Sequence, residues 1–315
     1  MSDLKVDVLM AGPQLPSLAD PVEREFNVHK LWLAADYSTF LADRAQMIRA
    51  IVTNAPVGAS AELIAALPRL EIISSSGVGL DAIDLAAARS RGVVVTSTPG
   101  VLNDCVADIG LALLLAVARR ICVADRFVRD GKWLEAKFPL ATSLNGKTCG
   151  VMGMGNIGSA VARRAEAFGM KIAYYNPSRK PELGYRYCAD PLTLAREADF
   201  VVLTLPGGPK THHIVDARFL DALGPEGYLI NIARGSVVDE AALVHALQAG
   251  RIAGAGLDVF EDEPRVPAEL MAMENVVLTP HVASGTHETR QAMSDLAFAN
   301  LHAHFNGKPV LTPVA

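Results

Sequence analysis

The feature that most constrains the fold is a glycine pattern near the middle of the chain. Residues 153–158 read Gly-Met-Gly-Asn-Ile-Gly, which is a G-x-G-x-x-G spacing. The apolar run Cys149–Met152 comes directly before it, and a helical pattern follows. A strand, a glycine turn and a helix in this order are typical of a dinucleotide-binding βαβ unit, because the helix start can hold a pyrophosphate. The alternative is a glycine-rich turn that binds no ligand. We predict that the following residues contact the cofactor: Gly153, Gly155, Asn156, Ile157 and Gly158.

Length and composition indicate an ordinary globular protein. The 315 residues are half hydrophobic and one-fifth charged, which is enough for two domains with a large core. The net charge of -5 and the absence of Lys/Arg runs argue against a nucleic-acid partner or an anionic membrane. We see no signal peptide and no apolar run of membrane-spanning length, so we expect a cytoplasmic protein. Four scattered cysteines lack metal-ligand spacing, so we expect buried thiols and no metal: Cys105, Cys122, Cys149 and Cys188.

Short apolar runs alternate with helical patterns from end to end. Such strands are typical of parallel sheets that helices cover on both faces. The first series comprises Val6–Met10, Ile48–Thr53, Glu71–Ser75 and Val93–Thr96. The second comprises Lys147–Met152, Lys171–Tyr175, Phe200–Leu203, Tyr228–Ile232 and Ala253–Asp258. Two consecutive series predict two α/β domains with a cleft between them.

Three further segments place reactive side chains directly after predicted strands. Arg234 offers a planar fork that matches a carboxylate, although it could also pair with a surface acid. His281 could donate a proton near neutral pH, and Glu263 is the candidate to orient it. We expect Glu261 and Asp262 to belong to a solvated acidic loop. The remaining histidines are expected to be ordinary: His29, His212, His213, His245, His287, His302 and His304.

Taken in order, these motifs resemble those of the D-isomer-specific 2-hydroxyacid dehydrogenases. The later motifs are Asn-x-x-Arg-Gly from Asn231, Gly-Leu-Asp-Val-Phe-Glu-x-Glu-Pro from Gly256, and Thr-Pro-His ending at His281. The resemblance covers essentially the whole chain. It implies that Arg234, Glu263 and His281 form the catalytic set, and that Arg234 and His281 also contact substrate.

The same resemblance implies further contacts and a domain arrangement. Main-chain amides at Val78 and Gly79, in a matching N-terminal loop, are expected at the substrate carboxylate, and Asp258 is expected at the cofactor. The implied fold is α/β with two doubly wound parallel-sheet domains. A Rossmann NAD(P)-binding domain, residues 99–284, is inserted in a flavodoxin-like substrate-binding domain formed by residues 1–98 and 285–315.

The segment after the second strand of the cofactor domain predicts which cofactor is used. An NAD enzyme of this kind carries an acid there, which bonds the ribose hydroxyls. Here the strand is followed by Asn176, Pro177, Ser178, Arg179 and Lys180, and the first carboxylate is Glu182. Two cations and a hydroxyl could bind a 2′-phosphate that an acid would repel. We therefore predict that Asn176, Ser178, Arg179 and Lys180 bind NADPH, and that NADH binds more weakly; the alternative is an exposed basic turn.

This combination is similar to the glyoxylate/hydroxypyruvate reductase group. It implies reduction of small 2-ketoacids to 2-hydroxyacids, glycolate and D-glycerate among them. A hydroxyphenylpyruvate or phenylpyruvate reductase is the alternative, because the residues do not rank the ketoacids. A non-enzymatic dinucleotide sensor, like the corepressors that resemble this family, is the alternative of another class.

One region predicts self-association. The helix Asn103–Arg120 is apolar on more than one face, and residues 126–144 then carry Trp133, Phe138 and Pro139 outside any obvious core. We expect a homodimer through this region, since exposed aromatic segments favour an interface. The alternative is a flap that packs on its own domain. Whether Phe138 reaches the substrate site of the partner subunit is left open.

Overall fold

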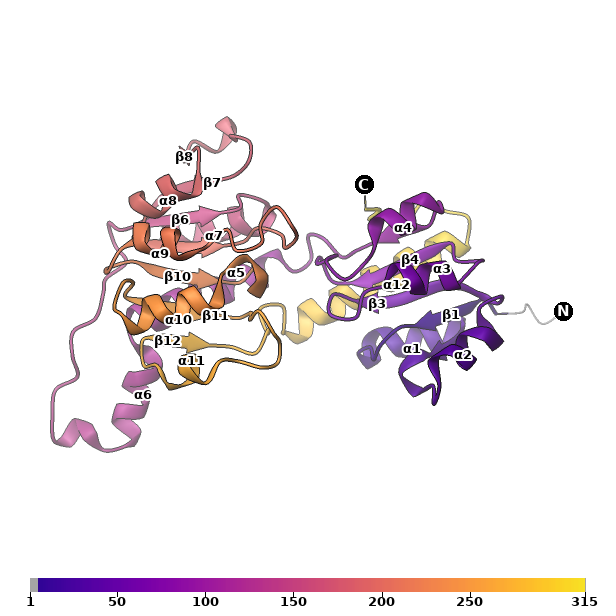
Figure 1. Cartoon of the computed structure of the whole chain (residues 1–315), viewed down its shortest axis with the longest axis horizontal. Helices are drawn as coiled ribbons and strands as arrows, with labels where there is room; N and C mark the ends of the chain where they lie inside the picture. Colours follow the sequence, from indigo (N-terminus) through magenta and orange to yellow (C-terminus); the bar gives the residue numbers. More distant parts are fainter. Residues whose placement is uncertain (1–4, 315) are drawn as a thin grey trace. The chain divides into compact units, whose positions relative to one another are not determined.

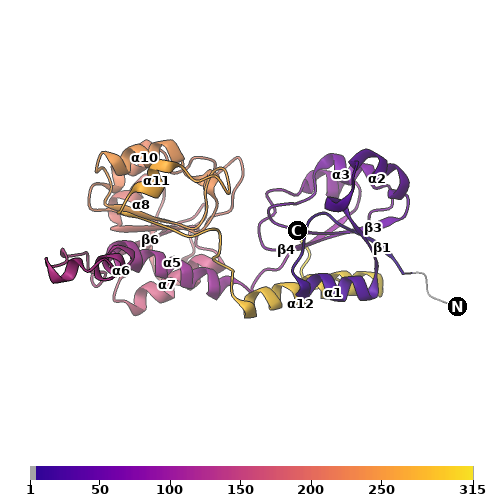
Figure 2. The same ribbon diagram turned by 90° about the horizontal axis from the view of Figure 1, so that it is seen from below.

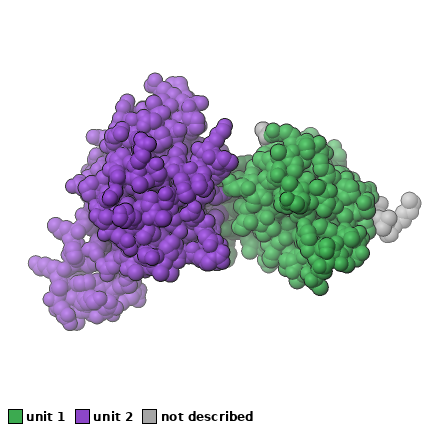
Figure 3. All heavy atoms as spheres, in the orientation of Figure 1, with its two compact units in different colours: residues 1–102, 285–315 green, residues 103–284 purple. Residues whose placement is uncertain are grey.

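The computed structural model describes residues 5–314 and divides into two compact units (Figure 3). Unit 1 runs to Leu102 and resumes at Gly285, and unit 2 spans Asn103–Ser284. Met1–Leu4 lie outside the described residues, and they include most of the segment in which we see no signal peptide. Within residues 5–314, no helix is both long and apolar enough to span a bilayer.

Unit 1 is built on a five-stranded parallel sheet with the order β2-β1-β3-β4-β5 (Figure 1). Its strands are β1 (Asp7–Met10), β2 (Asn27–Lys30), β3 (Ile48–Asn54), β4 (Ile72–Ser76) and β5 (Val94–Thr96). This is the flavodoxin-like order, in which the chain winds first to one side and then to the other.

Helices cover both faces of the unit 1 sheet (Figure 2). One face is covered by α1 (Pro16–Glu25) and α12 (His287–Phe305), and the other by α2 (Tyr37–Arg44), α3 (Ala61–Ala66) and α4 (Leu85–Ser90). On β1, Val8 and Met10 pack toward the first group of helices, whereas Leu9 packs toward the second. Both faces of the strand are therefore buried from Val8 to Met10, which explains why these three residues are all apolar.

Unit 2 contains a seven-stranded parallel sheet with the order β12-β11-β10-β9-β6-β7-β8 (Figure 1). Its strands are β6 (Thr148–Met152), β7 (Lys171–Tyr175), β8 (Arg186–Cys188), β9 (Phe200–Leu203), β10 (Tyr228–Asn231), β11 (Gly254–Leu257) and β12 (Val276–Leu278). From β8 to β11 this is the Rossmann order, and β12 extends it. The prediction of two doubly wound parallel sheets is confirmed.

Two layers of helices enclose the unit 2 sheet (Figure 2). One layer contains α5 (Asn103–Ala118) and α7 (Asn156–Ala167). The other contains α8 (Pro191–Glu197), α9 (Ala217–Leu223), α10 (Glu240–Gln248) and α11 (Ala268–Ala272). Helix α5 packs on α7, β10 and β11, so its own unit covers apolar surface on more than one face of the helix.

The segment after α5 is more ordered than its sequence predicts. It forms α6 (Ile121–Arg129) and a 3₁₀ turn, Lys132–Leu134, before the irregular stretch that leads to β6. Within it the rings of Phe127 and Phe138 meet edge to face at 5.3 Å, and the Arg120 guanidinium lies 5.5 Å from the Phe138 ring. We call residues 121–144 the α6 arm.

The cysteines only partly fit the prediction of buried thiols. Cys149 and Cys188 are buried, and burial raises the pKa of the Cys149 thiol to about 12. Such a thiol stays protonated and unreactive at neutral pH. The prediction is wrong for Cys122, which is exposed on α6, and Cys105 is half-buried.

Candidate active site

The three glycines of the loop after β6 meet three different demands. Gly153 has a left-handed φ of 103°, and a side chain there would lie 2.7 Å from the Leu205 nitrogen. A side chain at Gly158 would collide with the Gly153 carbonyl. At Gly155, by contrast, a Cβ would meet no atom of the described chain within 4 Å. Gly153 and Gly158 are therefore required for the turn and for close packing, whereas Gly155 keeps space open.

That open space adjoins the start of a helix. Gly155 is the N-cap of α7, so the N–H groups of Asn156, Ile157 and Gly158 belong to its first turn. The first N–H groups of a helix have no intrahelical partner, and the helix dipole makes this end attractive to anions. The loop thus fits the pyrophosphate of a dinucleotide. The structure brings together all five residues that the glycine pattern predicts.

A cavity of about 630 Å³ lies beside the glycine loop. It is lined by Met152, Gly153, residues 175–177, residues 205–211 and Ile214, at the carboxyl ends of β6, β7 and β9. The strand order reverses between β6 and β9, which is where open α/β sheets bind ligands. Sequence reasoning missed the loop 205–211 and its cation Lys210; the signal was the Leu-Pro-Gly-Gly-Pro run that directly follows a predicted strand.

The predicted ribose-binding residues lie in the turn after β7. Asn176 lines the cavity, and its side-chain amide donates to the Ser178 carbonyl at 3.2 Å. The Tyr174 hydroxyl accepts from the Lys180 backbone N–H at 2.7 Å and donates to the Lys180 carbonyl at 3.1 Å. These bonds hold both ends of the turn, while Ser178 and Arg179 remain exposed beyond the cavity.

The predicted acid–base pair is present in unit 2. His281 Nδ1 lies 2.7 Å from Glu263 Oε2, and the other carboxylate oxygen of Glu263 accepts from the Phe260 N–H at 3.1 Å. The His281 side chain is 41% exposed, so its ring can reach solvent or a ligand. With Nδ1–H donated to the carboxylate, Nε2 is the nitrogen that can exchange a proton with a ligand.

His281 also has an unusual backbone, which a buried carboxylate supports. Its φ is 51°, and its N–H donates to the Asp258 carbonyl at 2.8 Å. The Asp258 side chain is fully buried and accepts bonds from the Thr279 hydroxyl and from the N–H groups of Val282 and Ala283. Asp258 therefore fixes the turn that carries His281. Its predicted contact with the cofactor stays a prediction.

Arg234 follows β10, and its neighbour Gly235 lies against the loop that carries Glu263. Its guanidinium donates to the Ala233 carbonyl at 2.6 Å, and the Asn231 amide donates to the Arg234 carbonyl at 2.9 Å. Gly235 allows close contact between the two loops, because a side chain there would collide with the backbone of Phe260. Arg234, Glu263 and His281 thus all lie at the carboxyl edge of one sheet.

The acidic loop is exposed, as expected for Glu261 and Asp262, and both carboxylates have partners within the chain. Glu261 bonds His213 and Asp262 bonds Arg265. The backbone N–H of Glu261 also donates to Glu240, and burial, aided by the nearby carboxylates, raises the pKa of Glu240. Val78 and Gly79, the predicted substrate amides, belong to unit 1, where they follow the carboxyl end of β4.

Comparison with known proteins agrees with this site. A family model for the NAD binding domain of D-isomer specific 2-hydroxyacid dehydrogenases matches residues 111–283. Glyoxylate/hydroxypyruvate reductase A of Arabidopsis thaliana is 50% identical over 309 residues, which cover 98% of this chain and 99% of the relative. The chain belongs to the D-isomer-specific 2-hydroxyacid dehydrogenase family.

Further members of the family are similar over the same length. Hydroxyphenylpyruvate reductase of Plectranthus scutellarioides is 51% identical over 309 residues, which cover 98% of this chain and 99% of the relative. The crystal structure of an NADPH-dependent glyoxylate/hydroxypyruvate reductase from Sinorhizobium meliloti, in complex with NADP and malonate, matches with a TM-score of 0.93 and 44% identity, over 99% of this chain and 97% of that chain. The predicted resemblance to this dehydrogenase family is confirmed.

Proposed function

We propose that this dehydrogenase reduces small 2-ketoacids, glyoxylate and hydroxypyruvate above all, with NADPH. The observation that carries the proposal is the His281–Glu263 pair at 2.7 Å, on the same sheet edge as a glycine loop that accommodates a pyrophosphate. Relatives named as glyoxylate/hydroxypyruvate reductases, similar over nearly the whole chain, support the same substrate class. The products are the 2-hydroxyacids glycolate and D-glycerate.

His281 supplies the proton in this reaction. When bound, the reduced nicotinamide provides the hydride for the keto carbon. Glu263 holds Nδ1–H, so protonated His281 presents Nε2–H to the carbonyl oxygen and gives up that proton as the alcohol forms. The carboxylate also stabilises the imidazolium before transfer. Asp258 acts indirectly, because its carboxylate fixes the turn that carries the His281 ring.

Arg234 and the loop in unit 1 bind the substrate. The Arg234 fork donates to the substrate carboxylate and carbonyl, and it stabilises the negative charge that develops on oxygen. The main-chain N–H groups of Val78 and Gly79 bind the remaining carboxylate oxygen. These roles are proposed because Arg234, Val78 and Gly79 match the family's motifs at the corresponding positions.

The cofactor preference rests on the turn after β7. Ser178 and Arg179 are exposed there, and Lys180 is anchored through its backbone, which leaves its ammonium available. These groups suit a 2′-phosphate, and no acid precedes Glu182 to bind free ribose hydroxyls. NADP in the Sinorhizobium meliloti enzyme supports NADPH as the preferred cofactor, with NADH weaker.

A larger 2-ketoacid is the second candidate substrate, because hydroxyphenylpyruvate reductase of Plectranthus scutellarioides is 51% identical. The test is one panel of glyoxylate, hydroxypyruvate and 4-hydroxyphenylpyruvate with NADPH, followed by the loss of nicotinamide absorbance. We expect the highest kcat/KM with the two small ketoacids. A preference for the aromatic ketoacid would reassign the substrate, and no turnover with any ketoacid would support a cofactor-sensing protein.

Assembly and location complete the proposal. The α6 arm exposes large apolar side chains: Trp133 is 69%, Leu134 94% and Leu140 100% exposed. Apolar groups at this density favour a protein interface, so we infer a homodimer through the α6 arm. Phe138 packs on Phe127 of its own chain, which makes Leu140 the better candidate for a partner contact. We infer a cytoplasmic location, since the two buried thiols, Cys149 and Cys188, are unlinked, as is usual in a reducing compartment.

A further inference from the structure

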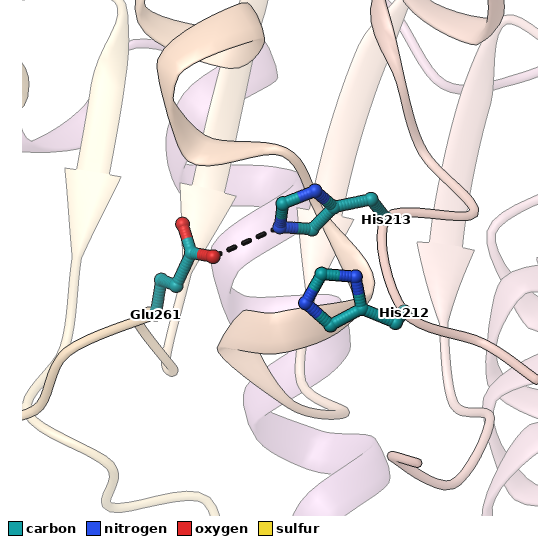
Figure 4. Close-up of side chains that lie close together, drawn as sticks. All are labelled: His212, His213 and Glu261. Carbon is teal, nitrogen blue, oxygen red and sulfur yellow. Dashed lines mark hydrogen bonds and ion pairs between the residues drawn. The ribbon is translucent and has the colours of Figure 1, made fainter. Parts of the chain in front are cut away.

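Two histidines and a glutamate form a cluster that the proposed reaction does not use. His213 Nε2 lies 2.8 Å from Glu261 Oε1, and the His212 and His213 rings stack with centroids 3.9 Å apart (Figure 4). One nitrogen of each ring and one carboxylate oxygen all lie within 4.8 Å of one another. Both rings turn a nitrogen-bearing edge toward the carboxylate (Figure 4).

An unusual backbone conformation makes this arrangement available. Neighbouring side chains point to opposite sides of an extended chain. His213 has a φ of 49°, in the left-handed region, and this turn lets two consecutive imidazoles share one side. A left-handed conformation is strained for a residue other than glycine, and such strain recurs at functional sites. In residues 5–314 only Arg120 and His281 share this feature, and His281 is the proposed proton donor.

The three side chains match the donor set of known zinc sites. Two imidazoles and one carboxylate, with water in the remaining position, bind Zn²⁺ in many proteins. Ligand atoms around a tetrahedral Zn²⁺ lie about 3.3–3.4 Å apart, given metal–ligand distances of about 2.0–2.1 Å. The cluster must therefore contract by at most about 1.5 Å, and the His213–Glu261 contact must lengthen as an ion replaces the shared proton. Side chains that are one-third or more exposed, as those of His213 and Glu261 are, can make this adjustment.

We propose that His212, His213 and Glu261 form a binding site for a divalent transition-metal ion, with Zn²⁺ as the best match. Glu240 adds negative charge nearby, because it accepts the backbone N–H of Glu261. The site links two functional loops of unit 2. His212 follows Thr211, the last residue of the cavity-lining run 205–211, and Glu261 lies two residues before Glu263. A bound ion ties the cavity loop to the loop that orients His281.

The test is calorimetric titration of metal-stripped protein with Zn²⁺, together with a thermal melt. We expect one Zn²⁺ per chain and a higher Tm, since an ion that binds only the folded state stabilises it. Co²⁺ in place of Zn²⁺ should give the visible absorption of a low-symmetry nitrogen–oxygen site. His212→Gln, His213→Asn and Glu261→Gln should each weaken binding about tenfold or more. Asparagine is chosen at residue 213 because it tolerates a left-handed φ.

His245→Gln is the matched control, because it removes an exposed histidine at the end of α10, outside the cluster. It should bind Zn²⁺ as the wild type does. The proposal is overturned if a correctly folded His212→Gln/His213→Asn double variant keeps wild-type stoichiometry and affinity. It is also overturned if binding is lost in His281→Gln but kept in the cluster variants, since the ion would then lie on the His281–Glu263 pair.

Discussion

Asp258 is a buried side chain that positions the proposed proton donor without being that donor itself. Its carboxylate is fully buried and accepts three bonds, two of them from the backbone directly after His281. Asp258→Asn keeps the size but replaces one acceptor by a donor, so a buried N–H loses its partner. We expect the free energy of unfolding to fall by about 1–3 kcal/mol.

The same variant should lower kcat about tenfold to a hundredfold, because small displacements of a catalytic group have effects of that size. KM for the ketoacid should change less, since Asp258 acts through His281. Chemical denaturation and steady-state kinetics measure both effects, and Thr279→Val, which removes a single bond to Asp258, is the milder control. Wild-type kcat and stability in Asp258→Asn would show that Asp258 does not position His281.

Two further residues, Arg179 and Lys180, are predicted to determine the choice of cofactor. Arg179→Ala combined with Lys180→Ala should weaken NADPH at least about tenfold while NADH changes little, because charge-assisted hydrogen bonds contribute about 1.5–3 kcal/mol each. Fluorescence titration with each cofactor measures this difference. Lys171→Ala, at the opposite end of β7, is the matched control. Equal losses for both cofactors would mean that these cations do not bind the 2′-phosphate.

At the scale of single elements, the glycines before and within α7 have two different roles. Gly158 allows close packing, whereas Gly155 keeps space open for the cofactor. Gly155→Ala adds a methyl group to open space, so stability should change by less than about 1 kcal/mol, the usual scale of an N-cap effect. Cofactor affinity should fall about five- to a hundredfold, because the methyl group occupies the space of the pyrophosphate.

Gly158→Ala should have the opposite primary effect. It should lower the stability, because its methyl group collides with the Gly153 carbonyl inside the protein. Thermal melts and cofactor titrations of the two variants, side by side, distinguish these roles. A Gly155→Ala protein that unfolds more readily than Gly158→Ala, or that binds NADPH as the wild type does, would contradict the assignment.

The same elements show what sequence reasoning could reach. Central strands such as β7 and β9 are predicted to the residue, because burial on both faces makes β9, and β7 after its exposed first residue, apolar. The edge strands β2 and β8 were missed, since each has a partner on one side only and carries exposed positions. A short polar edge strand resembles a loop in sequence.

The site residues, like the strands, were predictable where the local sequence carries a strong pattern. Residues with an ordered motif around them, such as His281 and Glu263, were predicted correctly as neighbours. The cluster of His212 and Glu261 was not, because 48 positions separate its bonded partners His213 and Glu261 and only the fold brings them together. The cavity loop was missed because its run of prolines and glycines is equally typical of an ordinary turn.

At the scale of the whole molecule, the α6 arm should set the oligomeric state. Light scattering should give twice the chain mass of 33.4 kDa at micromolar concentration. Leu140→Glu should shift the mass toward the single chain, because it places a charge in an apolar contact. Leu33→Glu changes a side chain that is 70% exposed in unit 1 and should leave the mass unchanged. A wild-type protein with the mass of one chain and full activity would refute the dimer.

The activity of the whole molecule joins the cofactor site, the substrate contacts and the proton donor, so one comparison tests the account most directly. It is the NADPH-dependent reduction of glyoxylate by the wild type and by His281→Gln, with NADPH affinity measured on both. We predict rapid turnover by the wild type and a loss of about 10²–10⁴-fold in kcat for the variant, at nearly unchanged NADPH affinity. Near-normal turnover by a folded His281→Gln protein would contradict the account.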